Sequence, residues 1–449
     1  MNTTALELVR GCERGIGRDV AIRVPSRTSV AVPGVSSKSS SLRRALSFAG
    51  PGYMVAVGYM DPGNWATSLS GGSSFGYSLL SVILLSNMMA MLLQAAAVRL
   101  GVASGLDLAQ SCRQHFSPAL NFVLWSGCEI AVVACNLAEV LGMACGLGLL
   151  FHTPLTIGVC ITVIDVMLVL GLQRKGVRYF ESFIIALVAL IGASFAVQVW
   201  WLHPPLAAVA QGFLPTSQIL SSPEMLYLAV GIVGATVMPH NLYLHSSIVQ
   251  TRQHDRCDAG IRQAIRYATL DSNIALGLAL FVNAGILVLA AGVFNRPGQG
   301  PVSSLEDAYH LLSPLLGVSA ASAVFGIALI ASGLSSSITG TLTGQIVMEG
   351  FLDIRVSRAK RALLTRCLAI VPAVVVAAWF GHAGVGKLLV FSQVVLGLQL
   401  PFAVVPLLWF TTRRKHLGAH AFRLRTSVCL WSIAIALVAI NVWVIYKLL

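Results

Sequence analysis

The chain has 449 residues, of which 56% are hydrophobic and only 10% are charged. Soluble domains carry about 25% charged residues, so this composition excludes a water-soluble fold and indicates a protein of the lipid bilayer. The formal net charge of +13 does not indicate nucleic-acid binding, because the basic residues cluster in short gaps between apolar runs, as they do beside membrane spans. We therefore expect no nucleic-acid partner.

The first 44 residues are polar, rich in Arg and Ser, and lack the apolar core and cleavage site of a signal peptide. We predict that residues 1–44 are a disordered cytosolic tail and that residues 45–449 form a single transmembrane domain. The nine cysteines include no CxxC pair, and most lie in or beside apolar runs. We interpret them as packing residues.

A spanning helix needs about 20 mostly apolar residues, and about eleven segments of the chain meet this requirement. They are residues 46–70, 75–98, 119–150, 154–172, 181–203, 224–250, 269–294, 316–348, 363–381, 387–410 and 426–447. We predict an all-α integral membrane protein with short connections, in which residues from about 295 to 315 form a plain surface loop.

The basic residues fall mainly on one side of the predicted membrane. Of the 30 Lys and Arg residues, all but Arg296, Arg366, Lys387 and Lys447 lie in the first 44 residues or in the connections after the second, fourth, sixth, eighth and tenth spans. Cytoplasmic loops carry such an excess of Lys and Arg. We therefore predict a cytoplasmic N-terminus, an odd number of spans and a C-terminus outside.

Two of the predicted spans share a helix-breaking motif. Residues 61–64 in the first span read Asp-Pro-Gly-Asn, and residues 238–241 in the sixth read Met-Pro-His-Asn. Proline removes a backbone donor and clashes with the preceding turn, so both helices should unwind near the bilayer midplane. Interrupted helices at matching positions are typical of inverted-repeat secondary transporters. We predict an inverted repeat of spans 1–5 and 6–10, with the eleventh appended.

The polar groups at these breaks suit a divalent transition metal. Asp61 is ionisable at mid-membrane, where a charge costs roughly 2.5–3.5 kcal/mol, so it needs a partner. Asn64 offers a neutral oxygen, and the unwound turns free backbone carbonyls, notably near Ala235. Met238 offers a thioether, which favours softer transition metals over Ca(II) and Mg(II). The simpler alternative is an ordinary proline kink with Met238 in the core, and the charge of Asp61 argues against it.

The segments 58–65 (GYMDPGNW) and 234–242 (GATVMPHNL) closely resemble the two signature segments of the Nramp family of proton-coupled Mn(II)/Fe(II) transporters. The resemblance extends over residues from about 45 to 447. It implies a leucine-transporter-type fold in the bacterial inner membrane and import of Mn(II), with Fe(II), Co(II) and Cd(II) as further substrates. It implies no permanently bound cofactor, with metal ions, protons and the lipid bilayer as partners. The oligomeric state stays open, since a monomer can suffice.

The resemblance also implies a metal site and a proton pathway. By motif, the metal ligands are Asp61, Asn64, Met238 and the carbonyl of Ala235. A glutamine of the tenth span joins them in some states of the family. Gln393 matches it best, and Gln399 is the competitor. The proton residues by motif are Asp61 again, His240 in the sixth span, Glu129 and Glu139 in the third, and Arg366 in the ninth. His245 follows on the sixth span, where we expect it to line the route. Two intramembrane acids with one Arg resemble a neutralised network.

One position departs from the family pattern. The third span usually contains Thr-Asp-Leu-Ala-Glu, whereas residues 135–139 read Cys-Asn-Leu-Ala-Glu here. Asn136 replaces the aspartate expected to relay protons, and an asparagine cannot titrate. We expect looser coupling between metal and proton movement, with a bypass through water and His245 as the other possibility.

Four other functions stay open at this point. An amino-acid carrier of the same fold would have to place a substrate carboxylate where Asp61 would repel it. A related magnesium carrier should lack the thioether of Met238. An intramembrane metalloprotease would need two zinc-binding histidines four residues apart, whereas His240 and His245 are five apart and no HExxH motif occurs. A channel-like uniporter would need no proton relay. We predict a secondary transporter and not an enzyme.

Overall fold

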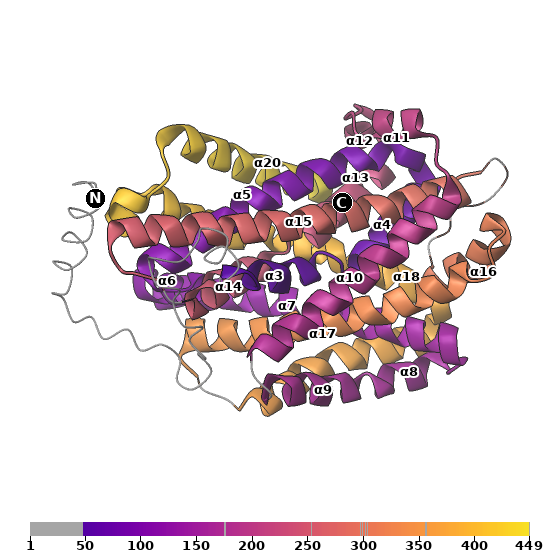
Figure 1. Cartoon of the computed structure of the whole chain (residues 1–449), viewed down its shortest axis with the longest axis horizontal. Coiled ribbons are helices and arrows are strands. Elements are labelled where there is room, and N and C mark those ends of the chain that lie inside the picture. The colour runs from indigo at the N-terminus through magenta and orange to yellow at the C-terminus, as the bar shows by residue number, and fades with distance from the viewer. Residues whose placement is uncertain are drawn as a thin grey trace, which may run out of the picture.

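The computed structural model describes residues 48–448, apart from residues 175–176, 253, 297, 299, 301, 303 and 355–356. The predicted tail at residues 1–44 lies outside this part of the chain. Figure 1 shows long helices running roughly side by side. The helices are α3 (Pro51–Gly58), α4 (Pro62–Phe75), η1 (Gly76–Leu79), α5 (Leu80–Ser104), α6 (Leu108–His115), α7 (Pro118–Phe151), α8 (Leu155–Ile161), α9 (Val163–Arg174), α10 (Val177–Leu202), α11 (Leu206–Gly212), α12 (Gln218–Ser221), α13 (Pro223–Val237), α14 (Pro239–Ile248), η2 (Val249–Thr251), α15 (Asp258–Phe294), α16 (Leu305–Leu316), α17 (Ala321–Leu352), α18 (Arg358–Thr412), α19 (Arg414–Leu417), η3 (Gly418–His420) and α20 (Leu424–Leu448).

Three of the long helices begin at a capping residue followed by proline. Ser117 accepts a hydrogen bond from the first turn of α7, and Ser222 does the same for α13. Asp61 caps α4 by accepting from the backbone N–H of Asn64. Proline at the first helical position leaves no N–H unsatisfied and has a φ suited to the helix. The local sequence therefore determines where these helices start.

Nine ranges among the described residues are long and apolar enough to cross a membrane. One of them, Pro62–Ser104, has 43 residues, whereas a crossing needs about 20. Gly76, with a φ of 60°, ends α4 inside this range, so α4 and α5 are separate helices. The predicted span 154–172 consists of the short helices α8 and α9. The all-α membrane fold is confirmed, whereas the number of about eleven crossings stays a prediction.

The long helix α18 contains two of the predicted spans. Gly381 interrupts it with a φ of 58° and a ψ of −153°, between the apolar ranges Ala359–Gly381 and Gly384–Thr412. Glycine adopts this backbone conformation without the strain that a side chain would cause. The predicted spans 363–381 and 387–410 are therefore distinct helices that meet at Gly381.

Basic connections meet at one end of the molecule. Arg99 at the end of α5 donates to the carbonyl of His420 at 2.7 Å, and His420 lies 3.2 Å from Asp258 at the start of α15. Arg113 of α6 lies 3.3 Å from Asp353, which follows α17. These contacts bring the connections after the second, sixth, eighth and tenth predicted spans together at the left in Figure 1. They support the prediction that these basic connections lie on one side of the membrane, which is the basis of the predicted orientation.

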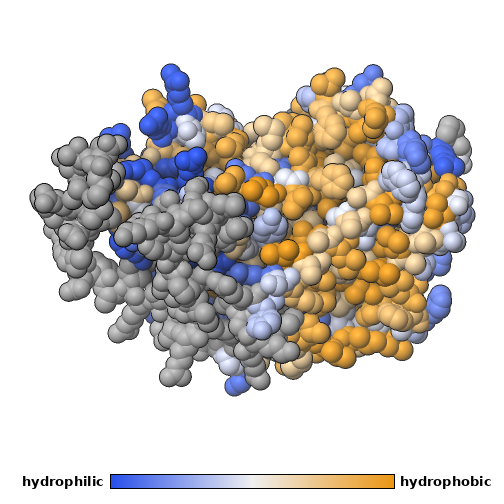
Figure 2. All heavy atoms as spheres, in the orientation of Figure 1, coloured by the Kyte–Doolittle hydropathy of each residue, from blue (hydrophilic) through white to orange (hydrophobic). Residues whose placement is uncertain are grey.

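The lateral surface of the molecule is apolar. Figure 2 shows hydrophobic residues over a broad area of the face in view, with polar residues gathered toward the two ends of the long axis. Large exposed apolar side chains include those of Phe151, Ile164, Trp200, Trp379 and Ile435. Soluble proteins rarely expose apolar surface of this extent, so this surface faces lipid.

The connection at about 295–315 is not a plain loop throughout. Helix α16 occupies Leu305–Leu316, and Ser304 caps it by accepting from the N–H of Asp307 at 2.9 Å. Glu306 and Asp307 lie in its first turn, where negative charge interacts favourably with the helix dipole. The acidic pair that we assigned to a loop therefore starts a helix.

Cysteine labelling tests the predicted orientation. In a variant without the native cysteines, Arg296→Cys and Lys415→Cys each introduce one exposed thiol, in connections that we predict on opposite sides of the membrane. A membrane-impermeant maleimide should label Arg296→Cys in intact cells and Lys415→Cys only after permeabilisation, because basic loops stay in the cytoplasm. The opposite labelling pattern would show that the predicted orientation is wrong.

Candidate functional site

The first predicted span is interrupted between α3 and α4. Its freed carbonyl groups are satisfied by two other helices. Asn283 of α15 donates to the carbonyl of Tyr59 at 2.8 Å, and Ser332 of α17 donates to that of Met60 at 2.6 Å. Unwound backbone at membrane depth requires protein groups of this kind. Neither donor was singled out from the sequence, since a lone Asn or Ser in an apolar span forms no pattern.

The sixth predicted span is interrupted at Met238, between α13 and α14. Met238 has a φ of 36°, a value that residues with a side chain rarely adopt, and Pro239 is the first residue of α14. The N–H of Met238 still donates to the carbonyl of Gly234 at 3.2 Å, which closes the last turn of α13. Both predicted helix breaks are confirmed.

The two breaks meet at the side-chain amide of Asn64. Its Nδ2 donates to Oδ1 of Asp61 at 2.7 Å and to the carbonyl oxygen of Ala235 at 2.9 Å. All three residues are buried, and Oδ2 of Asp61 has no hydrogen-bond partner among the described residues. An electropositive group is thus shared by a carboxylate and a carbonyl. Turning the amide over would replace the donor by Oδ1 and direct three oxygens at one point, as a dication requires.

The thioether of Met238 is buried at the same break. Nδ2 of Asn241 donates to its sulfur at 3.5 Å. Asn241 also lies against α3, because a Cβ at Gly58 would collide with its amide nitrogen. Asn241 therefore links the second broken helix to the first. The repeated x-Pro-x-Asn motif contains this residue, but we had given a role only to its counterpart Asn64.

Gln393 lies at the first break, and Gln399 does not. A Cβ at Gly63 would collide with the Gln393 amide, so this side chain rests directly on the first turn of α4. Its Nε2 donates to Oγ of Ser392 at 3.0 Å, and its Oε1 has no hydrogen-bond partner among the described residues. Gln399 lies beside Gly127 of α7 instead. Of the two glutamines, Gln393 is therefore the one that contacts α4 at the first break.

The two histidines of α14 are both fully buried, in different surroundings. Neither ring nitrogen of His240 has a hydrogen-bond partner within the described residues. His245 donates from Nδ1 to Oε1 of Gln94 at 2.8 Å, and Nε2 of Gln94 donates to the hydroxyl of Tyr59 at 2.8 Å. That hydroxyl donates to the carbonyl of Val237 at 3.4 Å. A buried polar chain therefore connects α14, α5, α3 and α13.

The acids expected in one proton network belong to two separate groups. Glu129 pairs with Arg361 through both carboxylate oxygens. Arg366 pairs with Glu139 at 3.3 Å and also with Asp165 of α9. Neither Arg361 nor Asp165 had been singled out. Arg361 lies at the edge of a predicted span among other basic residues, and Asp165 is a single acid in an apolar stretch.

Asn136 lies one turn before Glu139 on α7, and both side chains face Gly340 of α17. Nδ2 of Asn136 donates to the carbonyl of Val132 at 2.8 Å. The side chain is thus bound to its own helix, and it adds no titratable group beside Glu139.

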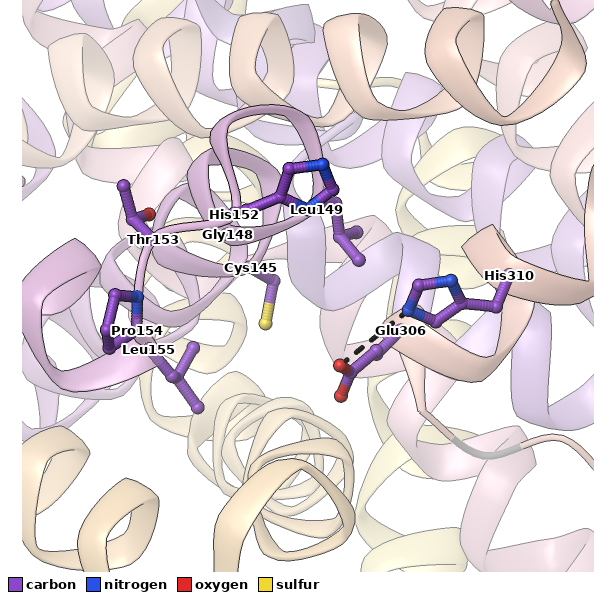
Figure 3. A pocket seen from close by; sticks show the side chains of 9 residues that line it. All are labelled: Cys145, Gly148, Leu149, His152, Thr153, Pro154, Leu155, Glu306 and His310. Carbon is purple, nitrogen blue, oxygen red and sulfur yellow. Dashed lines mark ion pairs between the residues drawn. The ribbon is translucent and has the colours of Figure 1, made fainter.

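A separate pocket of about 310 Å³ lies between the C-terminal end of α7 and α16. Figure 3 shows the Cys145 thiol, the Glu306 carboxylate and the His310 ring around it, with Glu306 and His310 3.9 Å apart. None of the predicted metal ligands lines this pocket. Within the described residues, no three His, Cys, Asp or Glu side chains are grouped so that they could hold a metal. The site at the helix breaks differs in kind, since it has one carboxylate beside amide, carbonyl and thioether groups.

A helical membrane protein with two helices broken at one buried polar centre has the architecture of a secondary transporter. The family described as Natural resistance-associated macrophage protein-like, or Nramp, matches residues 52–447. The chain belongs to this family.

Individual relatives cover most of the chain. A divalent metal cation transporter MntH of Bradyrhizobium diazoefficiens is 57% identical over 89% of this chain and 89% of its own length. The structure of a manganese transporter of Eremococcus coleocola is 39% identical, with a TM-score of 0.86, and the match covers 93% of this chain and 89% of that one. Mhp1, a nucleobase-cation-symport-1 transporter, is 14% identical with a TM-score of 0.60, over 88% and 89% of the two chains, and shares the fold alone. The leucine-transporter-type fold is thereby confirmed.

Gly63→Ala tests the contact between α4 and Gln393. The added Cβ would collide with the glutamine amide, and overpacking of this kind costs about 1–3 kcal/mol, so the thermal midpoint in detergent should fall. Gly277→Ala on α15 is the control, because a Cβ there meets nothing within 4 Å. Equal midpoints for the two variants would contradict the position of Gln393.

Proposed function

We propose that this chain is a secondary transporter that imports Mn(II) and related divalent transition-metal ions across the bacterial inner membrane. The observation that carries the proposal is the Asn64 amide, which is held at 2.7 Å from Asp61 and 2.9 Å from the carbonyl of Ala235 at the meeting point of two broken helices. The relatives named as a divalent metal cation transporter and a manganese transporter support the same substrate class.

The substrate ion would bind between the two broken helices. Asp61 supplies the negative charge, while Asn64, after its amide turns over, and Ala235 supply neutral oxygens. Met238 supplies the thioether that Ca(II) and Mg(II) do not favour. Gln393 supplies its Oε1, which has no hydrogen-bond partner among the described residues. One carboxylate neutralises only half of a dication's charge, and affinity rises with the number of charged ligands. Such a site suits an ion that must be released again.

Transport requires access from each side in turn, and the unwound segments supply the hinges. The predicted ligands are 0–2% exposed, so this conformation is closed around them. The hydrogen bond from Tyr59 of the first break to Val237 of α13 ties the two broken helices together beside the site. Its release would let α3 move relative to α13.

Proton movement forms part of the proposed function through the family resemblance. Asp61 and His240 are the proposed proton acceptors near the metal, and His245 lies further along α14. Asn136 cannot hold a proton, which is the basis for expecting looser coupling. Whether coupling is loose depends on whether another acid in the chain takes over that task.

Asp61→Ala tests the metal site. Loss of the only charged ligand from a buried site should remove several kcal/mol of binding free energy. Because about 1.4 kcal/mol already corresponds to a tenfold change in affinity, Mn(II) uptake into liposomes should fall more than tenfold. Glu224→Ala, which removes an exposed acid from the first turn of α13, is the control and should transport normally. Unchanged uptake by Asp61→Ala at equal protein levels would refute the proposed site.

Met238→Ala tests selectivity. The variant loses the soft ligand and keeps the oxygen donors, so Cd(II) uptake should fall more than Mn(II) uptake, and Ca(II) should compete better. Met225→Ala, which shortens another buried methionine of α13, controls for lost packing. If the Met238→Ala and Met225→Ala variants discriminate equally strongly against Ca(II), the role of Met238 is packing alone.

A further inference from the structure

Arg366 is shared by two buried carboxylates. Its Nη1 lies 3.3 Å from Oε2 of Glu139, and its Nη2 contacts Oδ2 of Asp165. The side chains of Arg366, Glu139 and Asp165 are only 1%, 0% and 4% exposed. They come from α18, α7 and α9. We call these three residues the acid–arginine triad.

The charges of the triad do not balance. With both acids ionised, two negative charges face one positive charge, and a buried charge without a partner is strongly destabilising. Other buried arginines among the described residues are engaged elsewhere, since Arg361 pairs with Glu129 and Arg252 pairs with Glu181. One bound proton would make the triad neutral.

The surroundings of Asp165 leave one carboxylate oxygen available to carry a proton. Its Oδ1 has no hydrogen-bond partner among the described residues, and the same holds for Oγ of Ser337 on α17. Ser337 lies beside Asp165, and its hydroxyl can donate to the ionised carboxylate or accept from the protonated one, so this neighbour accommodates both states. The charged or titratable groups that face Asp165 in the described segments are Arg366 of α18 and Glu139 of α7. Glu139 also experiences the negative charge of Asp61 at the first break, and the Cys135 thiol lies 3.5 Å from it.

We propose that Asp165 and Glu139 share one proton beside Arg366, and that this proton site takes over the relay task that Asn136 cannot perform. The proton-free triad carries one net negative charge, and uptake of one proton makes it neutral. Release of the same proton toward the cytoplasm restores the first state, so no other reactant is needed. The inference deepens the proposed function, since it assigns the missing acceptor to Asp165 and replaces the expected loose coupling by retained coupling.

Infrared difference spectra of the purified protein test the bound proton without transport. The protonated-carboxyl band at neutral pH should lose a component in Asp165→Asn and in Glu139→Gln, because each variant leaves one acid paired with Arg366. Glu129→Gln is the matched control and should keep that component, since Glu129 is already paired with Arg361. Raising the pH should lower the thermal midpoint of the wild type more than that of Asp165→Asn. An unchanged band in both triad variants, or the failure of both to fold, would overturn the shared proton.

Sealed liposomes test the relay itself. Asp165→Asn should still take up Mn(II) but should lose most of the accompanying acidification, and adding Asn136→Asp to it should restore acidification. A wild-type ratio of protons to Mn(II) in Asp165→Asn, or no acidification by the wild type, would overturn the relay role of the triad. A wild type that takes up no divalent metal would instead refute the proposed function, and the infrared test would still decide whether the proton is bound.

Discussion

Backbone polar groups that are freed inside a membrane must find partners in the protein, and this constraint shapes the centre of the molecule. The breaks between α3 and α4 and between α13 and α14 expose carbonyl groups at mid-helix. Asn283, Ser332 and Asn64 satisfy those of Tyr59, Met60 and Ala235. Helices α15 and α17 are therefore supports of the site, since they supply the donors that keep the first break unwound. The same breaks place the Asp61 carboxylate and the Ala235 carbonyl, two of the proposed ligands, on either side of the Asn64 amide.

Close helix packing brings the remaining groups to the breaks. A Cβ at Gly142 of α7 would collide with Pro62, and one at Gly234 of α13 would collide with α18 at Gln393 and Gly397. Small residues let membrane helices approach in this way. The approach at Gly142 brings α7, with Glu139 one turn away, beside the first break. The approach at Gly234 brings Gln393 beside both breaks. The arrangement of the proposed metal ligands and proton groups thus depends on glycines that carry no chemistry themselves.

Charge balance organises the region around α7. Glu129 has its own cation in Arg361, whereas Glu139 and Asp165 have one cation between them. The first arrangement is a neutral pair, and the second is neutral only with a proton. Asn136 is uncharged and hydrogen-bonded to its own helix, so it does not affect this charge balance. The site at the breaks follows a similar rule, because the single charge of Asp61 is stabilised by two hydrogen bonds from Asn64, which the proposed substrate cation would replace.

The sequence by itself determined the membrane class, the helical architecture, both helix breaks and the family. The length of each apolar segment and the position of each proline act on the helix that contains them, and the two signature segments identify the family without any knowledge of the fold. The sequence also indicated four candidate metal ligands, Asp61, Asn64, Met238 and Ala235, because they lie within those segments. Only the tertiary structure decided that Gln393 and not Gln399 reaches α4, that Glu129 pairs with Arg361, and that Asp165 joins Glu139 at Arg366. These partners lie on different helices and more than two hundred residues apart in most cases. Nothing in the sequence near an isolated acid or glutamine specifies which distant helix will pack against it.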